Sequence, residues 1–485
     1  MSRSSGRRSM RSRSGRDPMG VLFALAATGL ALLAAWPGGG VGFAESRWVA
    51  AAAWLLGGFG FFRNPTLRPS ASRWMSWLAV AAAAVFFVWG LLQRMPVPEK
   101  WMFRVWTGDP ARLAEIASDA RVFSVALDRF ESVHVWVLWS GLAMLAWAAS
   151  RSLRSETARF AAAFGGAGLG VIQVLAGVFF FKRPGWRLTG TFGSPDALGS
   201  LLAMTLPLTL GMIFHAARAP RRGQAGWHWR LHELATDWSA WTVPVLWMAF
   251  AIQWTGLLFS GSIGAAVSTL AACLLLMGWR AMEHPASRKG LVAGVVLLLL
   301  LAAGFSIHGY RKNVLDRSFN DASGIWRSKA TRVEIWRSTL HLCRLFPWGT
   351  GPGGTARALP MVQPGSYGRY RLDYVHNDTL QFLGDLGPVG LGALAAWLGL
   401  VAGHGARGCR RRPDPEKKRS AVWLARGSAA AFFAALLHAQ GEFSLSARPG
   451  VQVVFALVGG MLWAAGLPRG GAVRRSRHPR MRWLG

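Results

Sequence analysis

The side chains of this chain that could carry acid–base chemistry centre on a histidine in the segment YVHNDTLQ, residues 374–381. The imidazole of His376 could accept a hydroxyl proton at neutral pH, because an unperturbed histidine has a pKa near ~6.5. Asp378 and Gln381 have the spacing of a capping box, which predicts a helix start just after His376. Since a lone histidine in a loop is often structural, this residue does not define an enzyme by itself.

A basic segment, residues 332–344, precedes this histidine and predicts an amphipathic helix. Its apolar face would carry Val333, Trp336, Leu340 and Cys343. The opposite face would carry Arg337, His341 and Arg344. Guanidinium groups suit phosphate oxygens because they offer planar, paired donors. Lipid headgroup binding by a solvated basic face explains the same pattern.

A third segment, GTFGSPDALG at residues 190–199, predicts a helix N-terminus. Ser194 would be the N-cap and Pro195 the first helical residue, so that free N–H groups face an anion. Lys182, Arg183 and Arg187 lie just upstream and would add positive charge, although an ordinary helix cap explains the motif equally well. The supporting polar residues in these and neighbouring segments are Ser194, Asp196, Asn377, Asp378, His341, Arg344, His438 and Glu442.

Cysteine and metal chemistry are not indicated. The three cysteines, Cys273, Cys343 and Cys409, fall in a predicted span, a long loop and a linker, so no pair shares a compartment. The sequence has no HExxH motif, nucleophile elbow or zinc-ligand spacing. We therefore expect neither a metal ion nor a cofactor.

The elements that must position these residues are membrane spans. The 485 residues are 52% hydrophobic and only 16% charged, and apolar runs recur that are long enough to cross a ~30 Å hydrocarbon core. A water-soluble helical fold is a poor alternative, because a soluble protein carries about 25% charged residues. About twelve spans are predicted, at 19–37, 48–62, 74–93, 133–150, 159–181, 197–217, 239–259, 262–279, 290–307, 388–403, 421–438 and 450–467.

The positive charges set the orientation. The formal net charge is +33, but Lys and Arg cluster in alternate short connections, which indicates the positive-inside pattern and not nucleic-acid binding. Both termini are then cytoplasmic, as basic tails over residues 1–18 and 468–485, flanking a membrane domain over 19–467. A large loop over 308–387, between the ninth and tenth spans, would lie outside the cytoplasm with the candidate residues.

These motifs, in this order and topology, resemble the O-antigen ligase family of bacterial membrane glycosyltransferases. The likeness is carried by GTFGSPDALG, by TRVEIWRSTLHLCRLFPWGTGPGG in the long loop, and by YVHNDTLQFLGDLGPVG leading into the tenth span. It covers residues 180–400 well. Ligases, repeat-unit polymerases and protein O-oligosaccharyltransferases share these features.

The resemblance implies an all-α polytopic fold of the GT-C type in the bacterial inner membrane. The donor would be a glycan on an undecaprenyl-pyrophosphate carrier, and the acceptor a glycan, lipid or protein hydroxyl. His376 would activate the acceptor, and Arg332 or Arg337 would hold the pyrophosphate, without a metal. Membrane lipids would surround the protein, and no nucleic acid is expected as a partner.

The chain departs from the family at one turn. The family often has Ser-Arg between two middle spans, where the arginine serves the donor phosphate, but this chain reads Ser260-Gly261-Ser262-Ile263. Either Arg187 or Arg183 takes the place of this family arginine at the donor phosphate, or this protein binds its donor in a different way. A repeat-unit polymerase of the same superfamily is the nearest alternative function. A polytopic transporter or flippase is another, although transporters usually place ionisable residues near the middle of the membrane.

Overall fold

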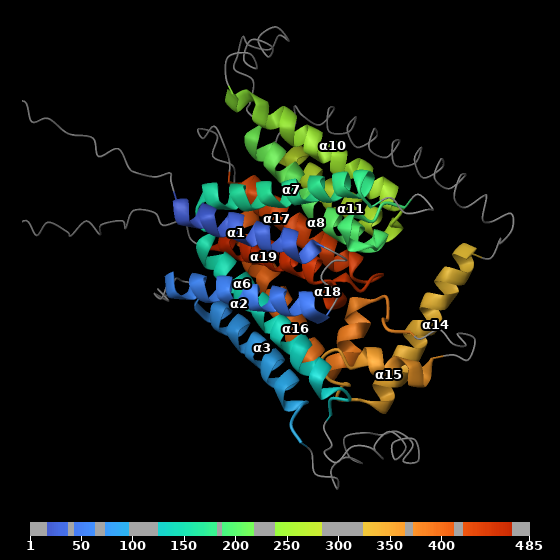
Figure 1. The fold of residues 1–485 in the computed structure, drawn as a ribbon. Helices are drawn as coiled ribbons and strands as arrows, with labels where there is room; N and C mark the ends of the chain where they lie inside the picture. Colours follow the sequence, from blue (N-terminus) through green and yellow to red (C-terminus); the bar gives the residue numbers. More distant parts are fainter. Residues whose placement is uncertain are drawn as a thin grey trace, which may run out of the picture.

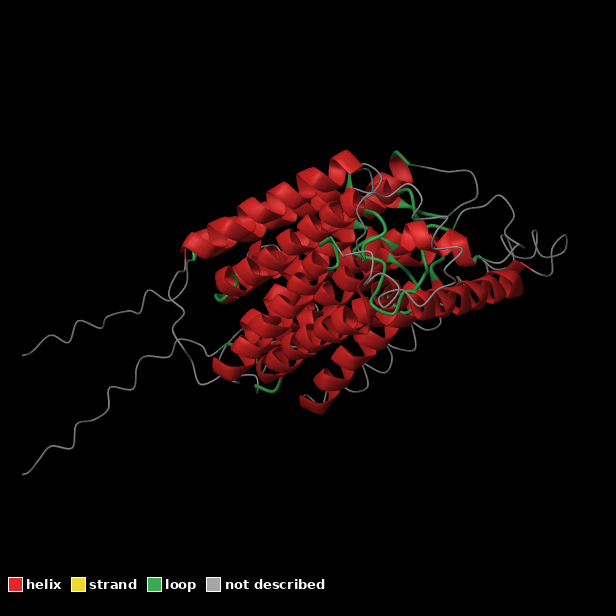
Figure 2. Ribbon diagram, turned by 90° about the horizontal axis from the view of Figure 1, so that it is seen from below, coloured by secondary structure: helices red, strands yellow, loops and turns green. Residues whose placement is uncertain are grey.

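The chain folds into a bundle of long α-helices with short helices packed at one end (Figure 1). The computed structural model describes residues 17–36, 43–63, 73–96, 125–181, 187–217, 238–283, 324–363, 372–411 and 421–467. Within these ranges every regular element is helical (Figure 2). The predicted ninth span at 290–307, the C-terminal basic tail and all of the N-terminal basic tail except Asp17 and Pro18 lie outside the described residues, as do parts of the large loop.

The helices follow the predicted spans closely. Their bounds are α1 Pro18–Ala35, α2 Phe43–Arg63, α3 Arg73–Leu92, α6 Arg129–Ser152, α7 Glu156–Phe179, η1 Gly190–Phe192, α8 Pro195–Ala216, η2 Trp238–Trp241, α10 Thr242–Ser260, α11 Ile263–Glu283, α14 Gly324–Leu345, α15 Thr355–Val362, α16 Asp378–Cys409, α17 Val422–His438, α18 Ser444–Ala447 and α19 Pro449–Gly466.

Nine helices of the described part are long and apolar enough to cross a membrane, namely α1, α3, α6, α7, α8, α10, α11, α16 and α19. Two further helices, α2 and the 17-residue α17, coincide with predicted spans as well. The prediction of a polytopic, all-helical membrane protein is therefore confirmed, while the total of twelve crossings stays a prediction.

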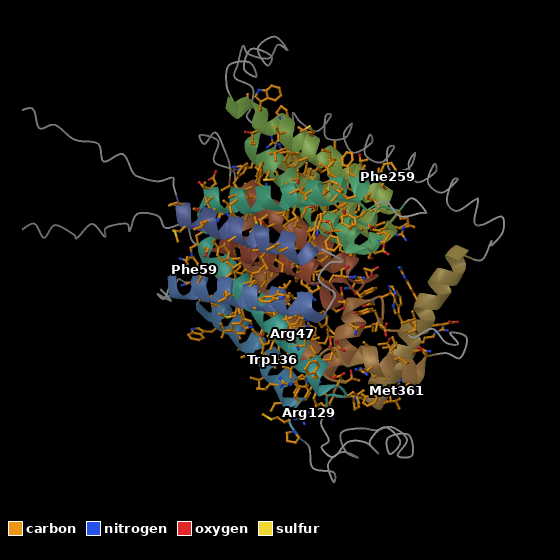
Figure 3. The ribbon with its side chains drawn as sticks, viewed as in Figure 1. Arg47, Phe59, Arg129, Trp136, Phe259 and Met361 are labelled. Carbon is orange, nitrogen blue, oxygen red and sulfur yellow. The ribbon has the colours of Figure 1, made fainter. Side chains whose placement is uncertain are left out.

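Apolar side chains cover the outside of the bundle, as expected for contact with lipid tails. Phe59 on α2 and Phe259 on α10 are 46% and 41% exposed and lie on the flanks of the bundle (Figure 3). The centre is formed by α8, whose whole apolar window is buried. There Gly211 of α8 approaches Gly427 of α17 so closely that an added Cβ would lie 2.8 Å from the Gly427 Cα. Small residues permit such close helix packing in membranes.

One end of the bundle, which we call the site end, gathers the turns that sequence analysis assigned to the outside. Thr191, before α8, donates a hydrogen bond to the carbonyl of Ala35 at the end of α1. Ser200 near the start of α8 bonds Ser444 of α18, with 2.7 Å between the hydroxyl oxygens. The backbone N–H of Asp378, at the start of α16, donates to the Ala439 carbonyl after α17 over 2.8 Å. The alternation of the predicted spans is thus consistent with the fold.

A buried ion pair marks the opposite end. Arg426, near the start of α17, lies 2.5 Å from Glu283 at the end of α11, and its Nε donates to the Cys409 carbonyl over 3.1 Å. Its guanidinium also lies 4.7 Å from the Trp423 ring centroid. This arginine is therefore paired, as a buried charge must be, and it lies away from the candidate residues.

The basic helix predicted at 332–344 is present as α14, but its buried face was predicted incorrectly. Val333 and Leu340 are 41% and 46% exposed, whereas Ile335 and Leu342 are almost fully buried. The helix packs beside α15 and α16, which select the face bearing Ile335 and Leu342. Residue spacing alone could not show which face of α14 is buried, because Val333 and Leu340 on one face and Ile335 and Leu342 on the other are all apolar.

Candidate functional site

His376 lies at the site end, immediately before α16, as predicted. The predicted capping box is wrong: the N-cap is Asn377, whose side chain accepts from the Leu380 N–H at 3.0 Å. Asp378 is instead buried and accepts from the backbone N–H groups of Leu445 and Ser446, at 2.9 and 2.8 Å. Its carboxylate thus joins α16 to α18 and does not cap its own helix.

The backbone of His376 is held in an unusual conformation. Its φ is +54°, the only positive φ at a residue other than glycine within the described ranges. Such a conformation costs energy and persists where neighbouring contacts fix it. Those contacts are present on both sides, since the Trp336 Nε1 donates to the Val375 carbonyl at 3.2 Å and the Asn377 Nδ2 donates to the Gln440 carbonyl at 2.9 Å.

Aromatic and carboxyl groups surround the imidazole. The buried Nδ1 of His376 lies 3.8 Å from the Glu442 Oε1. The ring meets Phe443 edge-to-face, with 4.7 Å between centroids, and Tyr374 stacks on the same Phe443 at 4.4 Å. The guanidinium of Arg448 lies 5.5 Å from the Phe443 centroid. Phe443 is therefore a shared platform that fixes the ring positions of Tyr374 and His376.

Burial keeps both members of the His376–Glu442 pair uncharged. Desolvation, together with the positive charge of Arg332, lowers the pKa of His376 to about 4, while Asp196 opposes this. Desolvation, with the negative charge of Asp196, raises the pKa of Glu442 to about 8. At neutral pH the imidazole is therefore neutral and can accept a proton. The Glu442 Oε1 faces Nδ1 at 3.8 Å, which is longer than a hydrogen bond, and Nδ1 has no hydrogen-bond partner among the described residues.

The structure distinguishes the two candidate arginines of α14. The charge of Arg332 acts on His376, His438 and Glu442, and its side chain is half-buried. Arg337 is exposed, like His341 and Arg344, so these three form the outward face that the sequence predicted. Of the two candidates, Arg332 is thus the arginine whose charge reaches the imidazole.

A second arginine lies at the turn that departs from the family. The Nε of Arg187 donates to the Ser260 carbonyl at 2.9 Å, and its Nη2 lies 3.4 Å from the Asp196 Oδ1. Gly261 has a φ of +63°, and a Cβ added to it would lie 3.2 Å from the Arg187 Nε. The Arg187 side chain thus lies against the turn between α10 and α11 and remains 47% exposed.

Of the other predicted residues, some lie at the site end and some are not among the residues that the structure describes. Ser194 is the N-cap of α8, as predicted, and accepts from the Ala197 N–H at 3.4 Å, with Pro195 at the first helical position. His438 is buried against the start of α11, beside Gly264. Lys182 and Arg183 lie outside the described residues, so only Arg187 of the upstream basic residues can be placed. Over the described ranges, no group of three potential metal ligands occurs.

Sequence reasoning missed the aromatic platform. Phe443 and Tyr374 contact or adjoin His376, yet neither stood out, because aromatic residues near span ends are ordinary interfacial anchors. Their one sequence signal is adjacency, since Phe443 follows Glu442 and Tyr374 precedes His376 by two residues.

The fold and site define a polytopic helical membrane protein with a buried imidazole, carboxyl groups and arginines gathered at one end of its bundle. Residues 248–395 match the family model described as O-antigen ligase, which confirms the family resemblance. The matched region runs from α10 into α16 and includes Arg332 and His376. No curated protein matches the chain.

Proposed function

We propose that this protein transfers a glycan from an undecaprenyl-pyrophosphate carrier to a hydroxyl acceptor, as an O-antigen ligase. The observation that carries the proposal is the neutral imidazole of His376, fixed by its backbone contacts and flanked by Glu442 on one side and the charge of Arg332 on another. The family match supports a membrane enzyme of the ligase or polymerase type.

In the proposed reaction, the acceptor oxygen forms a bond to the anomeric carbon while the bond from that carbon to the pyrophosphate oxygen breaks. His376 Nε2 takes the acceptor proton, and the carrier pyrophosphate leaves with the bonding electron pair. Glu442 faces Nδ1 on the same ring, where its ionised form, present above about pH 8, would favour the protonated imidazole. The pyrophosphate is already a good leaving group, so correct positioning supplies much of the rate.

Arg332 and Arg187 are the proposed pyrophosphate ligands. Negative charge grows on the leaving oxygens in the transition state, and fixed guanidinium groups stabilise it. Arg187 would replace the family arginine, because its guanidinium lies against the turn where that residue is missing. The N-terminus of α8, with Ser194 and Asp196, would complete this side of the site.

The site end would face the outer side of the bacterial inner membrane. The orientation is supported by Lys and Arg, which concentrate in the connections at the other end. Lipid-linked pyrophosphate lies at the membrane interface, and α14 carries its exposed arginines at that level of the bundle (Figure 1). Both termini would be cytoplasmic.

Replacing His376 should remove the base while keeping the fold. His376→Asn is the better variant, since Asn tolerates a positive φ, whereas His376→Ala adds backbone strain. We expect kcat for transfer to fall about 10²–10⁴-fold in both variants. The measurement is transfer from purified lipid-linked donor in detergent, with thermal stability as the folding control. Near-normal transfer by the Asn variant would refute the role of His376.

The pH profile should reflect the lowered pKa of His376. A base works when deprotonated, so kcat/KM should stay level down to about pH 5 and fall as the pH passes through about 4, instead of halving near 6.5. As the pH rises through about 8, Glu442 ionises and strengthens the base, so the rate should rise. Glu442→Gln should abolish the rise in rate above about pH 8 and leave the fall near pH 4 unchanged. An acid limb near 6.5 would contradict this assignment.

The position of the donor arginine can be tested by moving it. Arg187→Ala should lower kcat/KM for the donor about 10–100-fold, because a hydrogen-bonded charge pair is lost. Adding Ile263→Arg, at an exposed position on the first turn of α11, should restore part of that loss. Ile263→Arg alone is the matched control and should have little effect. Unchanged donor kinetics in Arg187→Ala would exclude a donor role.

A repeat-unit polymerase shares the same family match, and a deletion strain separates the two activities. For a ligase, deletion should remove all long glycan from the acceptor on a glycan gel. A ladder that collapses to a single repeat unit would instead show a polymerase. Complementation with the wild-type chain and with His376→Asn is the control, and only the former should restore the pattern.

A further inference from the structure

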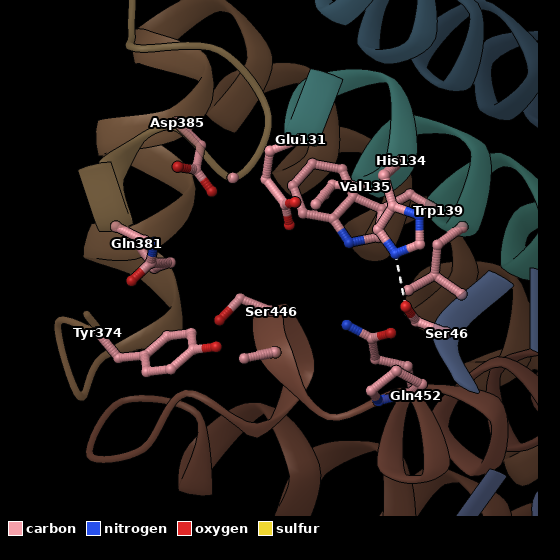
Figure 4. A pocket seen from close by; sticks show the side chains of 15 residues that line it. Ser46, Glu131, His134, Val135, Trp139, Tyr374, Gln381, Asp385, Ser446 and Gln452 are labelled. Carbon is pink, nitrogen blue, oxygen red and sulfur yellow. Dashed lines mark hydrogen bonds between the residues drawn. The ribbon is translucent and has the colours of Figure 1, made fainter. Parts of the chain in front are cut away.

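A polar cavity lies beside the site, between α2, α6, α15, α16, α18 and α19 (Figure 4). Its volume is about 210 Å³, far more than the ~10–15 Å³ that one water needs. Its polar lining includes Glu131, His134, Tyr374, Gln381, Asp385 and Gln452. The mechanism proposed above uses none of these side chains.

Two of the lining side chains have buried polar atoms without a partner. Trp139 is 7% exposed, and its Nε1 has no hydrogen-bond acceptor among the described residues. Gln452 is 4% exposed; its Nε2 donates to the Leu445 carbonyl at 2.9 Å, but its Oε1 has no donor there. An unsatisfied buried polar atom costs about 1–3 kcal/mol. A donor and an acceptor without partners thus belong to side chains that line the cavity.

The lining favours a neutral, hydroxylated ligand over an anion. Glu131 and Asp385 contribute carboxyl groups, and no Lys or Arg is among the described lining residues. Arg357 and Arg448 act electrostatically on the lining residues Glu131 and Tyr374 without lining the cavity themselves, so a pyrophosphate would meet the carboxyl groups and no guanidinium among the described lining residues. A sugar ring presents hydroxyls that both donate and accept hydrogen bonds, and C–H faces that pack on aromatic rings. Trp139 and Tyr374 supply such rings, and Gln381 and Gln452 supply amides.

The cavity is also connected to the imidazole. Tyr374 lines the cavity and stacks on Phe443, and the same Phe443 contacts His376. Neither Arg332 nor Arg187 lines it. A ligand here would therefore lie beside Tyr374, one aromatic ring away from His376, in a cavity that neither proposed pyrophosphate ligand lines.

From these observations we infer that the cavity binds a neutral sugar unit of the acceptor glycan, and places that glycan's reacting hydroxyl at His376. The inference rests on the proposed function. It makes Trp139, Tyr374 and Gln452 residues that determine acceptor binding.

The first test is kinetic and uses variants that each remove one polar group. Trp139→Phe removes the indole N–H, and Tyr374→Phe removes the hydroxyl while keeping the ring stacked on Phe443. Each should raise KM for the acceptor about 3–10-fold, the value of one hydrogen bond, and leave KM for the donor unchanged. Trp54→Phe is the matched control, because the Trp54 Nε1 donates to the Val137 carbonyl outside the cavity. A rise in donor KM instead would overturn the acceptor assignment.

The second test measures binding without turnover. Saturation-transfer NMR on the detergent-solubilised full chain would use neutral hexoses and N-acetylhexosamines as probes, with inorganic pyrophosphate as the anionic comparison. We expect sugar signals that weaken in Trp139→Phe and Gln452→Leu and persist in Trp54→Phe and His376→Asn. Sugar signals that are absent, or equal in all variants, would overturn the cavity site while leaving transfer by His376 unaffected. Sugar binding that depends on Trp139 in a protein without transferase activity would instead refute the proposed function.

Discussion

The buried carboxylate of Asp378 organises the site end of the bundle. It accepts hydrogen bonds from two backbone N–H groups of α18, so the start of α16 and the segment after α17 form one unit. The backbone N–H of the same residue bonds the Ala439 carbonyl, and the neighbouring Asn377 bonds Gln440. His376 and Glu442 belong to segments that are far apart in sequence, and these bonds bring them together. Without them the imidazole would have no fixed partner.

The site end has two electrostatic sides. Arg187 brings positive charge to the start of α8, where it pairs with Asp196, and the charge of Arg332 reaches His376 and Glu442. On the other side of the Phe443 platform, the cavity has carboxyl and amide groups. The proposed transfer from an anionic carrier to a neutral hydroxyl would be served by this separation. The imidazole of His376 contacts the Phe443 platform and is reached by the charge of Arg332.

Much of the fold could be predicted from the sequence because a bilayer imposes a strict length and apolarity on each crossing. The Ser194–Pro195 helix start and the position of His376 before a helix were also accessible, since both depend on neighbouring residues. The buried face of α14, the role of Asp378 and the Phe443 platform were not. Each depends on contacts with segments distant in sequence. In α14, two faces of the helix are apolar, and only its packing against α15 and α16 determines which of them is buried.

The attachment of Arg187 to a main-chain carbonyl affects which connection can supply the proposed donor arginine. Because the Ser260 oxygen belongs to the backbone, this bond does not depend on which side chains occupy the turn. Gly261 leaves room there for the long side chain of a residue that arrives from another connection. The proposed donor arginine can therefore be supplied to this turn from the connection before α8, and the sequence of the turn alone would not reveal it.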